Sequence, residues 1–203
     1  MILHDSDIRS ALHEKLHQKF GYDGTYDEVG LVNARIRTDI IQFVDNQIIG
    51  FEIKSDADEL KRLPKQIKGY SMLCDKVYLV VGDKLKEDAM ALIPDFWGVI
   101  LVKSLSKGVS LNIIKDAQSN PNNLVPELFS HCSVPKIKKL VGAMLPKPMR
   151  PHFRAQTKYQ MLFDCIKMLS DGTLNKHEFD VFLRQTFQSN LDSYKPDVLL
   201  TTE

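Results

Sequence analysis

The sequence lacks several features that define whole classes of protein. Its three cysteines, Cys74, Cys132 and Cys165, are scattered, and none belongs to a C-x-x-C pair. This spacing argues against a disulfide framework or a zinc finger and suits a reducing cytoplasm. No apolar run approaches the roughly 20 residues of a membrane span, and the chain turns acidic by Asp7, where a signal peptide would stay apolar. We therefore expect a cytoplasmic protein with no membrane partner.

An excess of charge of one sign is also missing. The chain has 27 Lys plus Arg against 26 Asp plus Glu, so its net charge of +1 identifies no class of partner. Ten Gly and nine Pro among 203 residues are too few for a linker or a fibrous protein. The length fits one fair-sized domain, or one domain with a small appendage.

Helical and extended patterns alternate along the first half of the chain. Apolar residues at helical spacing predict a helix over 6–20, with Ser6 as its N-cap and Gly21 as its stop. Runs rich in Ile, Val, Phe and Tyr predict extended segments, and charged stretches with apolar insertions predict further helices. The extended segments are 26–32, 36–44, 47–54, 76–81 and 96–102, and the further helices are 56–73 and 84–92.

These elements predict the order α-β-β-β-α-β-α-β, which indicates an α/β fold with a mixed sheet flanked by helices. After residue 103 the pattern becomes helical, with prolines in the connecting loops. We place a domain boundary near residue 115, so that residues 1–115 form the α/β domain and residues 116–203 form a helical C-terminal region. The predicted C-terminal helices are 124–130, 135–145, 157–170 and 176–188.

Two of the extended segments are separated only by Asp45-Asn46, which predicts a hairpin with a two-residue turn. In that register Asp39 faces Glu52, and Arg37 faces Lys54. Glu52 and Lys54 are two residues apart and therefore project from the same face of the sheet. Asp39, Glu52 and Lys54 are thus expected to converge, provided that the loop has two residues.

Two carboxylates about 5 Å apart on facing strands repel each other and require a positive partner. Lys54 supplies one charge, and a hard divalent cation such as Mg²⁺ or Mn²⁺ would supply more through oxygen ligands. A lysine beside such a cation can orient an attacking water and offset the charge that develops on a phosphoryl group. The pattern is typical of metal-assisted phosphodiester hydrolysis. The alternative is a set of surface ion pairs.

The next helix adds a second polar set. Gln66 and Tyr70 are four residues apart on one helical face, and Arg62 lies one turn earlier. An amide, a phenol and a guanidinium in one row can hydrogen-bond a water or a phosphate. The alternative is that Tyr70 packs into the core with Ile67 and Leu63 while Gln66 borders it.

Taken in order, Asp39, Glu52-Ile53-Lys54 and Gln66-x-x-x-Tyr70 resemble the motifs of the PD-(D/E)XK nuclease superfamily. The Gln-x-x-x-Tyr element resembles the RecB-like subgroup. The stretches Gly-Phe-Glu-Ile-Lys-Ser-Asp and Arg-Leu-Pro-Lys-Gln are similar to small bacterial and phage members of unassigned role. The likeness covers residues 6–102 and implies a restriction-endonuclease-like fold with an α-β-β-β-α-β core. The proline of the superfamily's name is absent, since Thr38 precedes Asp39.

The resemblance also implies roles for particular residues. Asp39, Glu52 and the main-chain carbonyl of Ile53 would bind Mg²⁺ or Mn²⁺, and Lys54 would position the water. Gln66 and Tyr70 would assist at the edge of the catalytic site. An earlier acidic ligand is also common in the superfamily. Glu28 is our candidate for it, and Glu14 is the alternative.

A basic segment follows in the second half. Residues 128–163 contain no Asp or Glu and seven positive charges, which leaves the rest of the chain with a net charge of −6. Phe153, Tyr159 and His152 lie among them, and this combination is suited to contact with a nucleic-acid backbone. The alternative is a solvated helix flank. The positive residues are Lys136, Lys138, Lys139, Lys147, Arg150, Arg154 and Lys158.

We therefore expect a Mg²⁺-dependent deoxyribonuclease, an endonuclease, whose C-terminal helices grip DNA or form a homodimer or larger assembly. Phage replication, host defence and DNA repair would each fit such an enzyme. A second hypothesis is a nucleic-acid-binding or protein-binding module that keeps the nuclease fold without cutting. A third is a structural protein whose carboxylates only make ion pairs. Metal binding separates the third hypothesis from the first.

Overall fold

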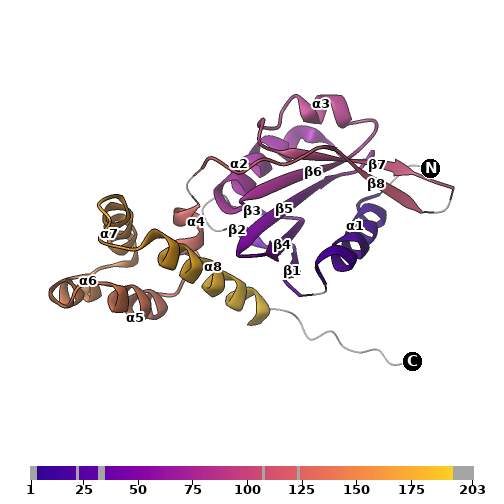
Figure 1. The fold of residues 1–203 in the computed structure, drawn as a ribbon. Coiled ribbons are helices and arrows are strands. Elements are labelled where there is room, and N and C mark those ends of the chain that lie inside the picture. Colours follow the sequence, from indigo (N-terminus) through magenta and orange to yellow (C-terminus); the bar gives the residue numbers. More distant parts are fainter. Residues whose placement is uncertain (1–3, 22, 32–34, 107, 123, 194–203) are drawn as a thin grey trace. The chain divides into compact units, whose positions relative to one another are not determined.

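A computed structural model describes residues 4–21, 23–31, 35–106, 108–122 and 124–193. The chain divides into two compact units, Met1–Leu124 and Val125–Glu203. The first is an α/β unit and the second is entirely helical across its described residues (Figure 1). The expected α/β fold with a helical C-terminal region is therefore confirmed. The division falls after Leu124, whereas the sequence pattern places it after residue 115.

A six-stranded mixed sheet forms the centre of the α/β unit. Its strands lie in the order β1-β4-β5-β6-β7-β8. The β5–β6 and β6–β7 pairs are parallel and the other pairs antiparallel. A separate two-stranded ribbon joins β2 to β3. The strands are β1 (Thr25–Asp27), β2 (Gly30–Leu31), β3 (Ile36–Arg37), β4 (Ile40–Val44), β5 (Gln47–Lys54), β6 (Lys76–Gly82), β7 (Gly98–Ser104) and β8 (Val109–Lys115).

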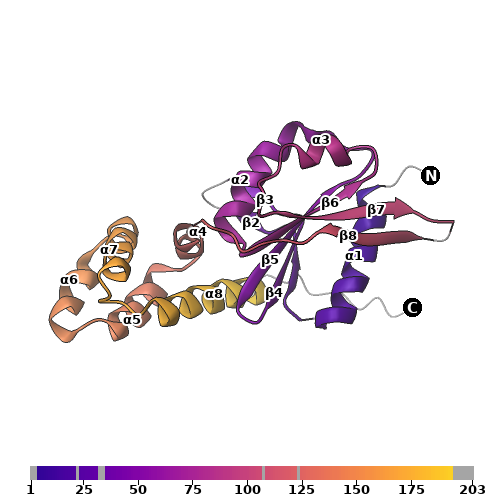
Figure 2. The same cartoon turned by 45° about the horizontal axis from the view of Figure 1, so that its top comes forward.

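Helices cover both faces of this sheet (Figures 1 and 2). On one face α1 (Asp5–Phe20) buries the stripe Ile8, Leu12 and Leu16 against residues of β4, β5, β6 and β7. On the other face η1 (Leu60–Arg62) leads into α2 (Leu63–Leu73), and α3 (Lys86–Met90) follows β6. Because both faces are covered, β5 and β6 are buried along most of their length, as is usual for strands with parallel neighbours.

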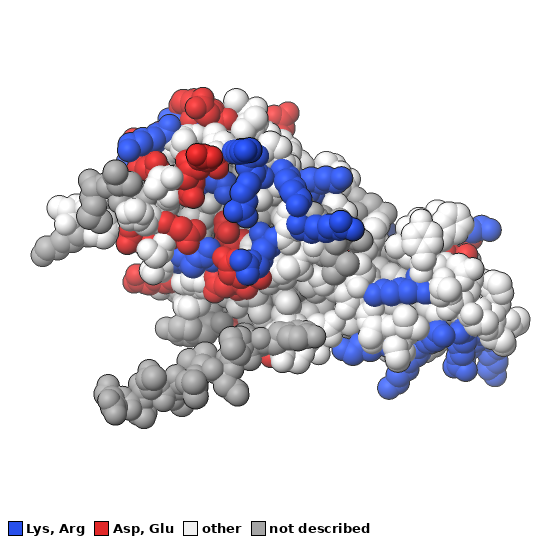
Figure 3. Space-filling model, turned by 180° about the vertical axis from the view of Figure 1, so that it is seen from behind, with Lys and Arg blue, Asp and Glu red and all other residues white. Residues whose placement is uncertain are grey.

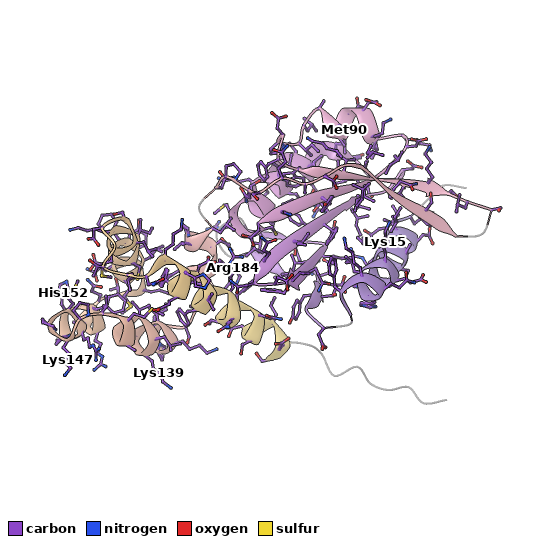
Figure 4. The ribbon with its side chains drawn as sticks, in the orientation of Figure 1. Lys15, Met90, Lys139, Lys147, His152 and Arg184 are labelled. Atoms are coloured by element: carbon purple, nitrogen blue, oxygen red, sulfur yellow. The ribbon has the colours of Figure 1, made fainter. Side chains whose placement is uncertain are left out.

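Several predicted elements differ from the observed ones. Helix α1 begins at Asp5 with His4 as its N-cap, rather than at Ser6, because Asp7 accepts a hydrogen bond from the His4 N–H. The extended segment 36–44 is interrupted between β3 and β4, and the segment 26–32 forms two short strands, with Val32 outside the described residues. Helix 56–73 begins only at Leu60. Strand β8 was not predicted, and Lys15 of α1 donates to its Leu111 carbonyl at 2.7 Å (Figure 4).

The helical unit contains α4 (Val125–Ser130), α5 (Val134–Met144), η2 (Lys147–Met149), α6 (Arg150–Ala155), α7 (Lys158–Ser170) and α8 (Lys176–Ser193). Its core includes Phe129 and Phe179, whose rings lie 6.5 Å apart. The predicted helices 124–130, 135–145, 157–170 and 176–188 are present, whereas the Pro-rich loop between them contains η2 and α6. Pro151 lies in the first turn of α6, where a missing N–H costs nothing.

All three cysteines are buried, and no disulfide joins them in the described part of the chain. No helix among the described residues is both long and apolar enough to cross a bilayer.

Candidate functional site

The predicted hairpin has the predicted register. Val44 pairs with Gln47, and Ile40 pairs with Phe51. Asp45 and Asn46 form the turn with φ values of 47° and 63°, the left-handed conformation that a two-residue hairpin turn requires. The ladder ends at Ile40, so Asp39 lies one residue beyond the last pair instead of facing Glu52 within it. Arg37 does not face Lys54, because it belongs to β3 and pairs with Gly30.

Tyr70 of α2 fixes the backbone where the ladder ends. Its hydroxyl accepts a hydrogen bond from the Asp39 N–H at 2.7 Å and donates one to the Phe51 carbonyl at 2.8 Å. The side chain is fully buried, and burial raises the pKa of its phenol well above the usual value. Gly50 permits this packing, since a Cβ there would lie 2.5 Å from the Tyr70 ring. Tyr70 therefore positions Asp39.

The Asp39 carboxylate turns toward β5. Its Oδ2 accepts a hydrogen bond from the Ile53 N–H at 2.7 Å, and its side chain is 17% exposed. Burial raises the pKa of Asp39, while the Ile53 N–H, Lys54 and Arg9 act in the opposite direction. Asp39 is therefore a partly buried carboxylate that still reaches the surface.

Glu52 and Lys54 form a buried ion pair on the α2 side of the sheet. Glu52 Oε1 lies 2.5 Å from Lys54 Nζ, and the two side chains are 0% and 8% exposed. The second oxygen, Oε2, is buried without a hydrogen-bond partner among the described residues. Burial, with a further contribution from the Asp39 charge, raises the pKa of Glu52 to about 8 despite the opposing effects of Lys54 and the Tyr70 hydroxyl. A buried carboxylate with one unpaired oxygen is costly unless a cation or a proton joins it.

The remaining residues predicted on α2 take two positions. Gln66 is buried on the same face as Tyr70, and its Oε1 has no hydrogen-bond partner in the described part of the chain. Arg62 is exposed in η1, directly before α2. Gln66 therefore offers a polar atom inside the fold, whereas Arg62 is accessible from outside.

Arg9 of α1 is a site residue that the sequence analysis missed. Its guanidinium donates to the Asp39 carbonyl at 2.9 Å, to Asp27 at 3.1 Å and to Glu28 at 3.1 Å, and it also pairs with Asp5. Burial lowers the pKa of Arg9, but the surrounding carboxylates outweigh it and raise the pKa above its usual value. Arg9 directly follows Ile8, at the border of the buried stripe, and this position was the signal in the sequence that could have identified it as a site residue.

Glu28, the candidate additional ligand, is held by two arginines. Its Oε1 contacts Arg9 and its Oε2 lies 2.8 Å from Arg37 Nε. Its backbone has a positive φ of 54°, and its N–H donates to the Asp39 carbonyl at 3.0 Å. Glu28 thus reaches the same end of β4 as Asp39. The alternative, Glu14, is exposed on α1 and accepts a hydrogen bond from Gln18.

The donor set can be tested for its fit to a divalent cation. The described residues contain no group of three or more His, Cys, Asp and Glu side chains that could hold a metal. Two carboxylates and a main-chain carbonyl are nevertheless sufficient for Mg²⁺, which usually retains several waters. The buried, unpaired Oε2 of Glu52 fits a cation ligand. Asp39, Glu52 and the Ile53 carbonyl therefore remain the candidate ligands.

Basic side chains gather on the helical unit (Figure 3). Lys136, Lys139, Lys147 and Arg154 are exposed, and Lys138 is partly buried. Lys139, Lys147 and His152 lie at one end of the unit and point away from its ribbon (Figure 4). Arg150 is different, because it donates to the carbonyls of Leu145 and Ala143 and thereby closes the turn after α5.

Comparison with known proteins gives one family match. The sequence model described as bacteriophage P4 protein cII matches residues 3–198. Protein cII of Enterobacteria phage P4 is 27% identical over 119 residues, which cover 56% of this chain but only 44% of that protein. Among solved structures, SfsA of Pyrococcus furiosus in complex with Ca²⁺ is 14% identical, with a TM-score of 0.33, over 56% of this chain and 64% of SfsA.

Proposed function

The chain belongs to the bacteriophage P4 protein cII family, whose name states no activity, and from the site itself we propose that it is a Mg²⁺-dependent nuclease acting on DNA. The proposal rests on the environment of the Glu52 carboxyl. This carboxyl is fully buried, one oxygen is paired with Lys54, and the other has no partner among the described residues. A buried carboxylate oxygen that can take a cation, beside a second carboxylate and a lysine, is suited to metal-assisted phosphodiester hydrolysis.

Asp39 and Glu52 would hold the cation, together with the carbonyl of Ile53. Bound Mg²⁺ supplies positive charge at the phosphoryl oxygens and lowers the pKa of a coordinated water. Lys54 is already within hydrogen-bond distance of Glu52. With a cation beside Glu52, the Lys54 ammonium would be available to orient the attacking water and to offset charge on the phosphate.

The α2 residues would support this centre without touching the reacting atoms directly. Tyr70 positions Asp39 through the two backbone hydrogen bonds of its hydroxyl. Gln66 presents a buried amide oxygen one turn away, which can accept a hydrogen bond from water at the site. Arg62 is exposed and can contact a phosphate of the substrate.

The helical unit would supply backbone contacts to DNA. Lysines and arginines that neutralise phosphates release counterions, so binding through them is strong at low salt and independent of sequence. The exposed residues suited to this role are Lys136, Lys139, Lys147 and Arg154, with Lys138 partly buried.

The test is a cleavage assay on linear, circular and single-stranded DNA with Mg²⁺, Mn²⁺ or EDTA. Wild type is compared with Asp39→Asn, Glu52→Gln and Lys54→Met. Asp45→Asn, an exposed carboxylate in the turn of the same hairpin, is the matched control. We expect metal-dependent cutting that the three site variants lose by at least 100-fold and the control retains, because each removes a ligand or charge used in the transition state. Opening of circular DNA identifies an endonuclease.

A non-cleaving DNA-binding module is the second candidate, and one observation favours it. Lys54 Nζ contacts Glu52 Oε1 within the fold, so Glu52 has a partner without any cation. This candidate predicts DNA binding with no cutting, even if a metal raises the melting temperature. Metal-dependent cutting that Glu52→Gln abolishes would favour the nuclease.

A further inference from the structure

Helix α7 is apolar on two opposite faces. One face packs Met161, Cys165 and Met168 into the core of the helical unit. On the other, Tyr159 is 81% exposed, Phe163 is 68% exposed and Ile166 is 38% exposed. The Tyr159 and Phe163 rings contribute little to the stability of the unit, because most of their surface remains in solvent.

These three residues, here called the aromatic row, form a single surface feature. Their spacing of four and three residues places them on one line along the helix. The helix start is fixed by Thr157 and Gln160, which exchange side-chain and backbone hydrogen bonds. Two flat rings are therefore presented in a row on a helix whose first turn is held in place.

The segment that leads into the aromatic row carries an excess of positive charge, which is suited to a polyanion. No Asp or Glu occurs from residue 128 to residue 163, a span that holds seven positive residues and ends at Phe163 itself. Asp164 follows, but its carboxylate accepts a hydrogen bond from Gln156 Nε2 at 2.6 Å. Exposed Lys167 lies one turn beyond Phe163. A partner for this surface would combine negative charge with flat apolar groups.

We propose that the aromatic row binds single-stranded nucleic acid, by stacking unpaired bases on Tyr159 and Phe163 while exposed basic residues of the helical unit, Lys167 among them, contact phosphates. Rings beside positive charge are the usual platform for single strands, because every base has a face that can stack. In a duplex those faces are already stacked on neighbouring bases. This inference rests on the proposed nuclease function in one respect, namely that a single strand bound here would be the substrate of the nuclease.

A tryptophan reporter tests the stacking directly. The chain has one tryptophan, Trp97, and it is fully buried, so Phe163→Trp adds the only tryptophan exposed on the row. Oligo(dT) and a hairpin duplex of equal phosphate number are titrated in EDTA, where no cleavage can occur. We expect quenching of the new fluorescence by oligo(dT) and little by the duplex.

Binding by fluorescence anisotropy separates stacking from simple apolar contact. Tyr159→Leu and Phe163→Leu keep apolar area but lose the ring, whereas Tyr159→Phe keeps it. We expect each leucine variant to lose about 5- to 150-fold in affinity for oligo(dT), the range of base–aromatic stacking. Tyr159→Phe and Leu92→Ala, which changes an exposed leucine of the α/β unit, should bind as wild type does.

Three results would overturn the inference: equal affinity of the leucine variants and wild type, equal quenching by duplex and single strand, or sedimentation showing that the aromatic row pairs two copies of the chain without DNA. Cleavage needs metal, whereas binding of oligo(dT) is measured in EDTA. A failure of cleavage and a failure of stacking are therefore distinguishable.

Discussion

The buried Glu52 carboxyl predicts that the protein loses stability as pH rises when no metal is present. Burial raises the pKa of Glu52 from 4.5 to about 8, with Asp39 adding to the effect and Lys54 opposing it. The folded protein therefore keeps a proton that the unfolded chain releases. Its stabilising contribution is fully present below pH 4.5 and is lost as pH rises through 8.

The size of the effect follows from the two pKa values. Each tenfold difference in proton affinity is worth about 1.4 kcal/mol, so the free energy of unfolding should fall by about 4 kcal/mol between pH 5 and pH 8.5 through this group alone. Glu52→Gln preserves the shape of the side chain and an oxygen for Lys54, but it cannot ionise. The variant should match wild type near pH 5 and exceed its stability by about 4 kcal/mol at pH 8.5.

The assay is urea unfolding of both proteins in EDTA, at steps across this pH range. Groups that titrate alike in the two proteins cancel in the difference. Glu14→Gln, which changes an exposed carboxylate on α1, is the control and should follow wild type at every pH. If the difference between Glu52→Gln and wild type stayed constant with pH, Glu52 would be ionised throughout and held by Lys54. Burial would then not control the protonation of Glu52.

Three further predictions concern packing and binding. Tyr70→Phe removes the hydroxyl that serves two backbone groups and should cost about 1–3 kcal/mol in urea unfolding; an unchanged midpoint would contradict the positioning role. Gly50→Ala, whose Cβ would lie 2.5 Å from that ring, should cost about 1–3 kcal/mol, whereas Gly30→Ala, with no atom within 4 Å, should fold normally. Replacing Lys139 and Lys147 by Gln should weaken DNA binding and lower the slope of log affinity against log salt by about 2; an unchanged slope would place the DNA elsewhere.

Local sequence was sufficient to predict the hairpin that contains Glu52 and Lys54. A two-residue turn leaves only one register for the strands on either side, so the pairing of β4 with β5 followed from Asp45 and Asn46. The face shared by Glu52 and Lys54 followed from the alternation of a strand. Their contact at 2.5 Å agrees with that prediction.

The end of the ladder could not be predicted in this way. The segment 36–44 is rich in β-formers, and Asp39, although uncommon in strands, does not by itself fix where the pairing stops. The break depends on Tyr70, thirty-one residues later, whose hydroxyl takes the Asp39 N–H. Arg9 was missed for the same reason, since its partners Asp27, Glu28 and Asp39 lie on other elements.

Two elements were missed because their local signals were weak. Strand β8 has exposed Ile113 and Ile114 and lies at the edge of the sheet, so it shows little alternation between buried and exposed positions. Helix α6 is six residues long and lies among prolines, and this composition predicted a loop. Pro151 is compatible with a helix because it lies in the first turn.

The sequence by itself determined which chemical groups are present, their order, and the strand face from which Glu52 and Lys54 project, because those depend on neighbours along the chain. Only the tertiary structure decided the charge state of the site. The pKa of Glu52 is raised because helices cover both faces of the sheet and remove water from its carboxyl, and because Asp39 lies nearby. Burial of this kind is a property of the whole fold, since no short segment can exclude solvent from itself.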